Sequence, residues 1–271
     1  MTGVYRGQGI LGISRSFNIV KKEYIMIKAV IFDIDNTLYD YDRANSAAMA
    51  AVEDYAAEHF GWSRDETERK VKNSFEEIRA AHGKKAVIHN RLVRFQRILE
   101  KEEIPLSPHA LKMYDIYWDT LTASSVLFPG LVDTLDHLKA HGYKLGIGTN
   151  MTSVMQFRKL EALSILKLFD FVVSSEEAGY EKPDKVLFML CVSKSGCDAS
   201  ECLYVGDNLK SDIQAAERAG LRAAWFVPEK EPLPDGAPLP VDHIGRQEAD
   251  GSVLCFSEYE ELPDLIRKIQ I

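Results

Sequence analysis

The stretch "AVIFDIDNTLYD", residues 29–40, joins an apolar run to two acids and decides the fold. Residues 27–33 predict a buried strand, and Asp33 and Asp35 stand at its end, two positions apart. Side chains at positions i and i+2 of an extended chain point the same way, so the two carboxylates should lie close together and repel each other. The stretch therefore raises the question of why two like charges are held at the end of a buried strand.

The composition restricts the classes of protein to which the chain can belong. Its 271 residues are enough for one large domain, or for a core domain and a smaller one. No apolar run approaches the roughly 20 residues needed to cross a bilayer. The formal net charge is −8 and no block of Lys and Arg occurs, which argues against nucleic acid and membranes as partners.

The cysteines and the N-terminal segment bear on location. The cysteines are Cys191, Cys197, Cys202 and Cys255, none of them in a CxxC pair, and no secretion signal is evident. We expect free thiols in a cytoplasmic protein. Residues 1–25 lack periodicity and the apolar centre of a signal peptide, so we expect them to be an extension outside the fold.

The spacing of apolar residues changes twice along the chain. Four helices are predicted after the first strand, at residues 43–60, 63–83, 86–102 and 107–124. After residues 128–130, helices and strands alternate, which predicts a parallel sheet covered by helices on both faces. The predicted fold is therefore α/β: a Rossmann-like core of residues 26–40 and 126–271, and a four-helix insert of residues 41–125.

Polar side chains follow several of the predicted strands. In order along the chain they are Asp33 and Asp35, Thr149 and Asn150, Lys182 in "GYEKPD", and Asp207 and Asp212 in "VGDNLKSD". Ligands of open α/β sheets bind at the carboxyl ends of the strands, so these side chains should meet at one edge. Each of them alone has a simple structural explanation, but together they offer a nucleophile, a hydroxyl, a cation and a second acidic pair.

On these residues the chain resembles the haloacid dehalogenase-like hydrolase superfamily. "DIDNT" matches its first motif, D-x-D-x-T, Thr149 the hydroxyl of its second, Lys182 the lysine of its third, and "GDNLKSD" its acidic fourth. The resemblance covers about residues 27–230 and is strongest to phosphatases of small phosphorylated metabolites. It implies that the four-helix insert is the helical cap of that superfamily.

The chemistry of the residues agrees with a phosphatase. A carboxylate, here Asp33, can attack phosphorus and form an aspartyl-phosphate. Attack on a phosphate dianion about 4 Å away is opposed by roughly 8 kcal/mol at an effective dielectric constant of 20, so cations must offset the repulsion. Asp33 and Asp207 form an oxygen site suited to Mg²⁺, which Asp212 supports, and the resemblance adds the backbone carbonyl of Asp35. Lys182 supplies a further positive charge.

The second aspartate answers the opening question. Asp35 is expected to protonate the leaving oxygen and then to activate water as a base, so both carboxylates must reach one phosphorus centre. The alternative is two surface acids that cap a turn. Thr149, Asn150 and Lys182 are expected to bind the phosphoryl oxygens.

The helical insert is expected to cover the site and to contact the leaving group. Residues 38–41 would form its hinge. Arg91 and Arg94, together with Arg97 at helical spacing, are candidates to bind a second anionic group of the substrate, but a solvated helix face is the favoured interpretation. His137 and His141 have the spacing of zinc ligands on a helix, but no third ligand is evident, so we interpret them as surface residues.

The sequence thus predicts a Mg²⁺-dependent phosphatase, monomeric or homodimeric, that acts on small nucleoside monophosphates or sugar phosphates. A phosphomutase would share every core motif. A haloacid dehalogenase uses the same nucleophile, but that branch lacks the second aspartate, so Asp35 argues against it. Phosphonate hydrolysis would need a lysine in the cap that cannot be assigned. A non-catalytic binding module is the alternative from a different class.

Overall fold

The computed structural model describes residues 26–83, 85–228 and 253–269. Six strands in these ranges form one sheet in the order β3-β2-β1-β4-β5-β6, and every neighbouring pair is parallel. The strands are β1 Ala29–Phe32, β2 Lys144–Thr149, β3 Phe171–Ser174, β4 Cys202–Gly206, β5 Arg222–Phe226 and β6 Leu254–Phe256. The predicted α/β fold with a parallel sheet is confirmed.

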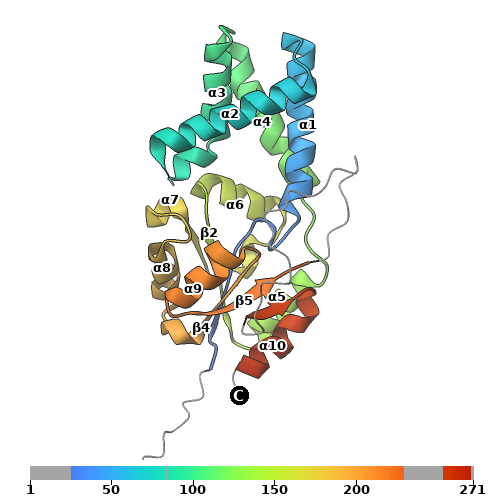
Figure 1. Ribbon diagram of the computed structural model, residues 1–271. Helices are drawn as coiled ribbons and strands as arrows, with labels where there is room; N and C mark the ends of the chain where they lie inside the picture. Colours follow the sequence, from blue (N-terminus) through green and yellow to red (C-terminus); the bar gives the residue numbers. More distant parts are fainter. Residues whose placement is uncertain (1–25, 84, 229–252, 270–271) are drawn as a thin grey trace, which may run out of the picture.

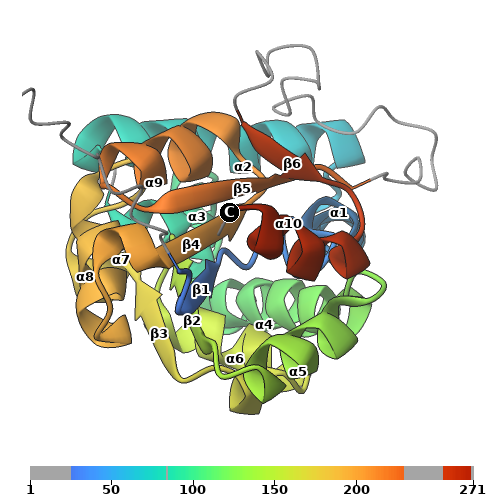
Figure 2. The same ribbon diagram turned by 90° about the horizontal axis from the view of Figure 1, so that it is seen from below.

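Helices cover both faces of the sheet. They are α5 Leu131–Ala140, α6 Ser153–Ala162, α7 Ser175–Ala178, α8 Lys185–Ser195, α9 Gln214–Arg218 and α10 Leu262–Ile269. Because alternate residues of a strand point to opposite faces, Val30 and Phe32 of β1 pack in one core with α5, α6 and α10. Ala29 and Ile31 pack in the other core with α8 and α9. Figure 2 shows the sheet between these two layers.

A helical insert lies between β1 and β2 in the chain. Its helices are α1 Tyr41–Phe60, α2 Arg64–His82, α3 Arg91–Lys101 and α4 Leu106–Ser124. They stand above the carboxyl ends of the strands, with α6 directly beneath them (Figure 1). These helices are consistent with the predicted cap, and its treatment as a separate domain of residues 41–125 stays a prediction.

One of the four predicted insert helices is wrong in its extent. The sequence predicts a single helix over residues 86–102, but the structure has a 3₁₀ turn, Ala86–His89, and then α3. Asn90 separates them because its side-chain oxygen accepts hydrogen bonds from the backbone N–H groups of Leu92 and Val93. An asparagine in that geometry begins a new helix and does not continue the old one.

One further prediction concerns a segment that the structure does not describe. The proposed N-terminal extension, residues 1–25, lies outside the described ranges. The last of the described ranges contains β6 and α10. In the described ranges, no helix combines the length and the apolar character that a bilayer crossing requires.

Candidate active site

Three carboxylates meet at the ends of β1 and β4. The two strands are in register, with Phe32 opposite Val205, so the residues that follow them emerge side by side. Carboxylate oxygens of Asp33, Asp207 and Asp212 all lie within 4.8 Å of one another. They form the one group of three or more ligand-type side chains found in the described ranges. The acidic ends of the first and fourth motifs therefore make a single site.

Lys182 supplies the positive charge of this site. Its Nζ lies 2.8 Å from an oxygen of Asp33 and 2.7 Å from an oxygen of Asp212, and it donates to the Tyr204 hydroxyl at 3.0 Å. Burial alone would lower the pKa of Lys182, but the charges of Asp212 and Asp33 outweigh it and raise that pKa well above its usual value. Lys182 is therefore a permanent cation.

Among the described residues, Lys182 pairs with two of the three carboxylates, Asp33 and Asp212. Burial raises the pKa of Asp33 to about 6, even though the charge of Lys182 acts in the opposite direction. The three carboxylates lie within 4.8 Å of one another and offer only oxygen ligands. Such a site fits a divalent cation of the Mg²⁺ kind. Asp33, Asp207 and Asp212 would hold it.

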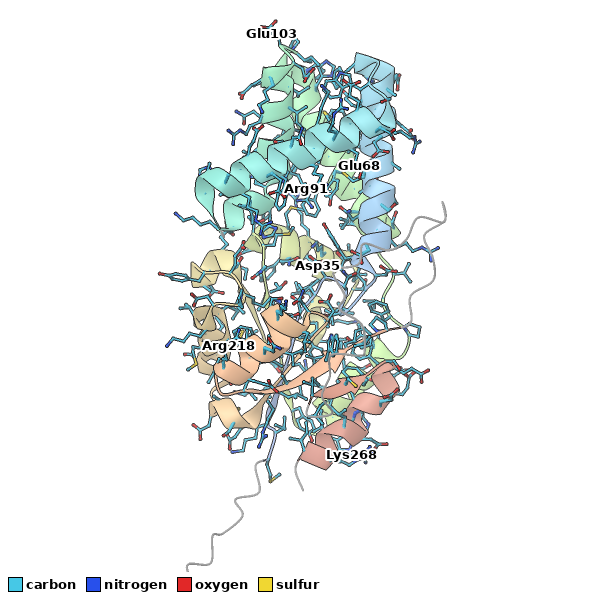
Figure 3. All side chains as sticks on the ribbon, viewed as in Figure 1. Asp35, Glu68, Arg91, Glu103, Arg218 and Lys268 are labelled. Carbon is cyan, nitrogen blue, oxygen red and sulfur yellow. The ribbon has the colours of Figure 1, made fainter. Side chains whose placement is uncertain are left out.

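Asp35 does not belong to the group of three carboxylates and has partners of its own. Nζ of Lys159 donates to both of its carboxylate oxygens, at 2.7 and 2.8 Å, and the Tyr39 hydroxyl donates to the first of them at 2.7 Å. Asp35 lies at the top of the core, below Arg91 of the insert (Figure 3). The two aspartates of the opening stretch thus have separate partners. Metal binding by the Asp35 backbone carbonyl stays a prediction.

The second-motif residues are fixed by hydrogen bonds within the core. Nε2 of Gln156, a fully buried residue of α6, donates to Thr149 Oγ1 at 2.8 Å. The side-chain oxygen of Asn150 accepts from the Lys182 backbone N–H at 2.8 Å, and its amide donates to the Lys182 carbonyl. Asn150 therefore holds the loop that carries Lys182, and its contact with substrate stays a prediction.

The arginines of α3 correct an interpretation from the sequence. Arg91 and Arg94 are each only 7% exposed, so a solvated helix face is wrong for both. The guanidinium of Arg91 donates to the hydroxyls of Tyr41 and Tyr117 at 3.0 and 3.1 Å. Nε and Nη2 of Arg94 donate to the Ile88 carbonyl. Within the described ranges neither arginine forms an ion pair with a carboxylate.

His137 and His141 agree with the surface interpretation. His137 on α5 and His141, which directly follows it, are both exposed, and their rings stack with centroids 4.1 Å apart. Neither belongs to the acidic group.

Four supporting residues escaped the reasoning from sequence. They are Gln156, Lys159, Tyr204 and Trp225, whose indole N–H donates to the Asp207 carbonyl at 2.7 Å. A signal for the first two was present, because Gln156 and Lys159 recur at helical spacing beside the buried Met155 and Leu160. Polar residues on the apolar face of a helix indicate buried partners.

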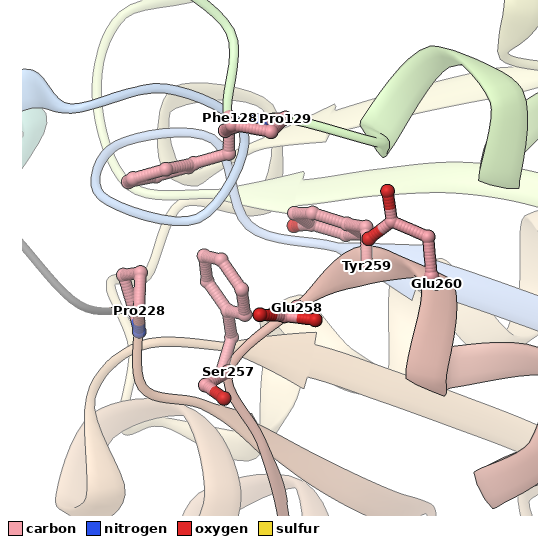
Figure 4. Close-up of a pocket in the computed structure, with 8 residues that line it drawn as sticks. Phe128, Pro129, Pro228, Ser257, Glu258, Tyr259 and Glu260 are labelled. Carbon is pink, nitrogen blue, oxygen red and sulfur yellow. The ribbon is translucent and has the colours of Figure 1, made fainter.

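A separate cavity of about 430 Å³ lies beside the end of β5 (Figure 4). Its lining consists of Phe128, Pro129, Phe226, Pro228, Ser257, Glu258, Tyr259 and Glu260. The charged side chains of this lining are both carboxylates, and it contains no lysine, arginine or histidine. The strand-end site differs in holding the ammonium of Lys182 among its carboxylates.

Residues 27–220 match the family described as haloacid dehalogenase-like hydrolase. The chain belongs to this family. Within it, the hydrolase is 36% identical over 240 residues to a ribulose-1,5-bisphosphate 5-phosphatase of Halopiger xanaduensis, a match covering 88% of this chain and 99% of that one. It is also 36% identical to a glyceraldehyde 3-phosphate phosphatase of Methanopyrus kandleri, over 72% of this chain and 82% of that one.

The fold of the hydrolase agrees with that of a solved relative. The crystal structure of a phosphatase of this superfamily from Thermococcus onnurineus superposes with a TM-score of 0.64 at 22% identity. It covers 89% of this chain and 98% of the other. The predicted membership in the phosphatase branch is confirmed, and the hydrolase is an enzyme of the phosphoric monoester hydrolase class.

Proposed function

We propose that this hydrolase is a Mg²⁺-dependent phosphatase of small sugar phosphates that acts through an aspartyl-phosphate on Asp33. The observation that carries the proposal is the convergence of three carboxylates within 4.8 Å around one buried ammonium. The carboxylates of such a site can hold a cation, while its ammonium attracts a phosphoryl group. A bound Mg²⁺ would neutralise charge on the phosphoryl oxygens.

The side chains of the site divide the reaction between them. Asp33 attacks phosphorus while Lys182 offsets its charge, and the Thr149 hydroxyl donates to a phosphoryl oxygen. Because Gln156 already donates to Thr149 Oγ1, the hydroxyl proton of Thr149 is directed away from Gln156. Asp35 gives a proton to the leaving oxygen, and then takes one from the water that cleaves the aspartyl-phosphate.

The proposed substrates are phosphorylated sugars of three to five carbons. The named activities of the two relatives, on ribulose 1,5-bisphosphate and glyceraldehyde 3-phosphate, support this class above nucleoside monophosphates. A cytoplasmic location is part of the proposal, and all four cysteines are free thiols, as a reducing compartment requires.

We also propose that Arg91 binds a second anionic group of the substrate. Its guanidinium has two tyrosine hydroxyls as partners and no carboxylate in the described ranges, which leaves its charge uncompensated. Arg94 has the same burial but uses its donors on the Ile88 carbonyl. Arg94 therefore serves to hold the 3₁₀ turn before α3.

The test measures phosphate release from a panel of sugar phosphates and nucleoside monophosphates. We expect turnover of sugar phosphates that chelator abolishes and Mg²⁺ restores. Ca²⁺ should restore little, because it prefers more ligands and a looser geometry. Full turnover in excess chelator would refute the metal dependence, and a preference for nucleoside monophosphates would refute the substrate class.

A further inference from the structure

We infer that Lys159 is a positioning residue that orients the carboxylate of Asp35, and that the seated helical insert completes this arrangement. The inference rests on the proposed function, in which Asp35 handles the protons. It assigns a catalytic task to a helix, α6, that follows the second motif and carries none of the four motifs.

The contacts of Asp35 fix the rotation of its carboxylate. The Lys159 ammonium donates to both oxygens, and the Tyr39 hydroxyl approaches Oδ1 from a second direction. Three hydrogen bonds from two donor groups leave the carboxylate plane little freedom to turn. Asp35 itself keeps a quarter of its side chain exposed, so it remains accessible to a leaving group or to water.

The ammonium of Lys159 is enclosed by parts of both the core and the insert. It reaches up from α6, its side chain is 1% exposed, and it lies 5.3 Å from the Tyr41 ring and 5.7 Å from the Trp118 ring. Tyr41 begins α1 and Trp118 belongs to α4, so both rings come from the insert. Aromatic faces attract a cation at these distances. Displacement of the insert would therefore expose the ammonium that orients Asp35.

The position of Lys159 on α6 argues against an ordinary surface charge. Its neighbour Arg158 is exposed, whereas Lys159 shares the buried face with Gln156. In the described ranges, the one carboxylate that pairs with Lys159 is Asp35, 124 positions earlier. The side chain thus has a single polar partner, and that partner lies in the active site.

The experiment compares Lys159→Met with the matched control Arg158→Met. Single-turnover phosphoryl transfer is measured with Mg²⁺ for two substrates: glycerol 3-phosphate, whose alkoxide leaves poorly, and 4-nitrophenyl phosphate, whose phenolate leaves well. We expect Lys159→Met to slow transfer from the alkyl phosphate by about 10²-fold, at the low end of acid–base effects, since Asp35 is still present. Transfer from the aryl phosphate should change less than about threefold, because it needs little proton donation.

Two further variants separate positioning from a purely structural role. Lys159→Arg should recover most of the rate with the alkyl phosphate, and Tyr39→Phe should slow that substrate selectively by a smaller factor. Equal losses on both substrates in Lys159→Met and Tyr39→Phe would overturn the inference, as would a wild-type rate for Lys159→Met with the alkyl phosphate. If Lys159→Met does not fold, Tyr39→Phe and Lys159→Arg decide the matter by the same criterion. Absence of Mg²⁺-dependent turnover in the wild-type enzyme would instead refute the proposed function.

Discussion

The acidic site of the core and the arginine pair of the insert carry opposite surpluses of charge. In the core, three carboxylates lie within 4.8 Å of one another, and Lys182 pairs with two of them. In the insert, Arg91 and Arg94 lie buried on α3 without a carboxylate partner in the described ranges. Burial and the nearby charge of Arg91 lower the pKa of Arg94 to about 9, because the two guanidinium groups repel each other.

Uncompensated buried charge costs several kcal/mol, and a chain retains it where something else supplies the counter-charge. The carboxylates of the core therefore indicate a bound cation, and the buried charges of Arg91 and Arg94 indicate a bound anion. Asp35 and Lys159 lie between the two regions as a balanced pair. A substrate with a phosphoryl group at one end and an anionic group at the other would match this order of charges.

The largest expected effect is loss of the nucleophile. Asp33→Asn should lower turnover of every substrate by at least about 10⁴-fold, because no other carboxylate can take over covalent attack. Steady-state phosphate release and mass spectrometry of the trapped protein would measure it. An aspartyl-phosphate that still forms in Asp33→Asn would mean that the Asp33 carboxylate serves a step other than nucleophilic attack.

The second-largest expected effect is loss of Asp35, the carboxylate that pairs with Lys159. Asp35→Asn should slow transfer from an alkyl phosphate by about 10²–10⁴-fold, the usual range for acid–base catalysis. With 4-nitrophenyl phosphate the first step should survive and the second should fail, since water lacks its base. Rapid quenching should then show a burst of nitrophenol and phosphate on Asp33. Phosphate trapped by Asp33→Asn but not by Asp35→Asn would reverse the assignment.

A third prediction concerns how much the buried charge of Asp33 lowers the free energy of unfolding. The pKa of Asp33 is raised from 3.8 to about 6, so ionisation of Asp33 opposes folding. At about 1.4 kcal/mol per tenfold change in proton affinity, this cost is on the order of 3 kcal/mol. It is absent below the unfolded value, appears as the pH rises through about 6, and is fully present at pH 8.

In chelator at pH 8, Asp33→Asn should therefore melt a few degrees above the wild type, and the difference should vanish towards pH 4. Excess Mg²⁺ should reverse the order, because only the wild type keeps the full set of ligands. Calorimetry with and without chelator measures both. A lower melting temperature of Asp33→Asn in chelator at pH 8 would show that Lys182 already balances the site.

The smallest expected effect tests whether the buried charge of Arg91 binds an anionic group of the substrate. Arg91→Met should weaken kcat/KM for ribulose 1,5-bisphosphate about 10-fold more than for 4-nitrophenyl phosphate, which is the usual value of one charge-assisted hydrogen bond. Arg94→Met is the matched control, since Arg94 is equally buried but bonds to the Ile88 carbonyl. Its losses should be equal on both substrates. Equal losses from Arg91→Met would assign Arg91 to structure alone.

The parts of the site that sequence reasoning found share one property. Asp33 and Asp207 directly follow β1 and β4, Thr149 ends β2, and Lys182 lies in the loop after β3 and α7. The carboxyl edge of a parallel sheet brings strand ends together without any knowledge of packing. The order of helices and strands was likewise predictable, because its apolar periodicity is local.

The parts that sequence reasoning missed depend on contacts over long separations. Lys159 in "QFRKLEA" stands on the apolar face of its helix, but the sequence does not show that its partner is Asp35, 124 positions earlier. The burial of Arg91 could not be read from α3, because the rings that cover it belong to α1 and α4. The break at Asn90 depends on which of two local hydrogen-bond patterns the chain adopts, and the apolar spacing does not distinguish them.

The contact between Tyr259 and Thr37 has a consequence for protein recombination. The fully buried hydroxyl of Tyr259 donates to the Thr37 carbonyl at 2.5 Å, in the turn that follows the two aspartates and 222 positions earlier in the chain. The Tyr259 carbonyl in turn accepts from the Thr134 hydroxyl at 3.0 Å. A chimaera that exchanges the C-terminal segment between relatives would alter the backbone beneath the nucleophile, even with all four motifs intact. The crossover points of such chimaeras should be chosen so that residues 37, 134 and 259 all come from the same parent.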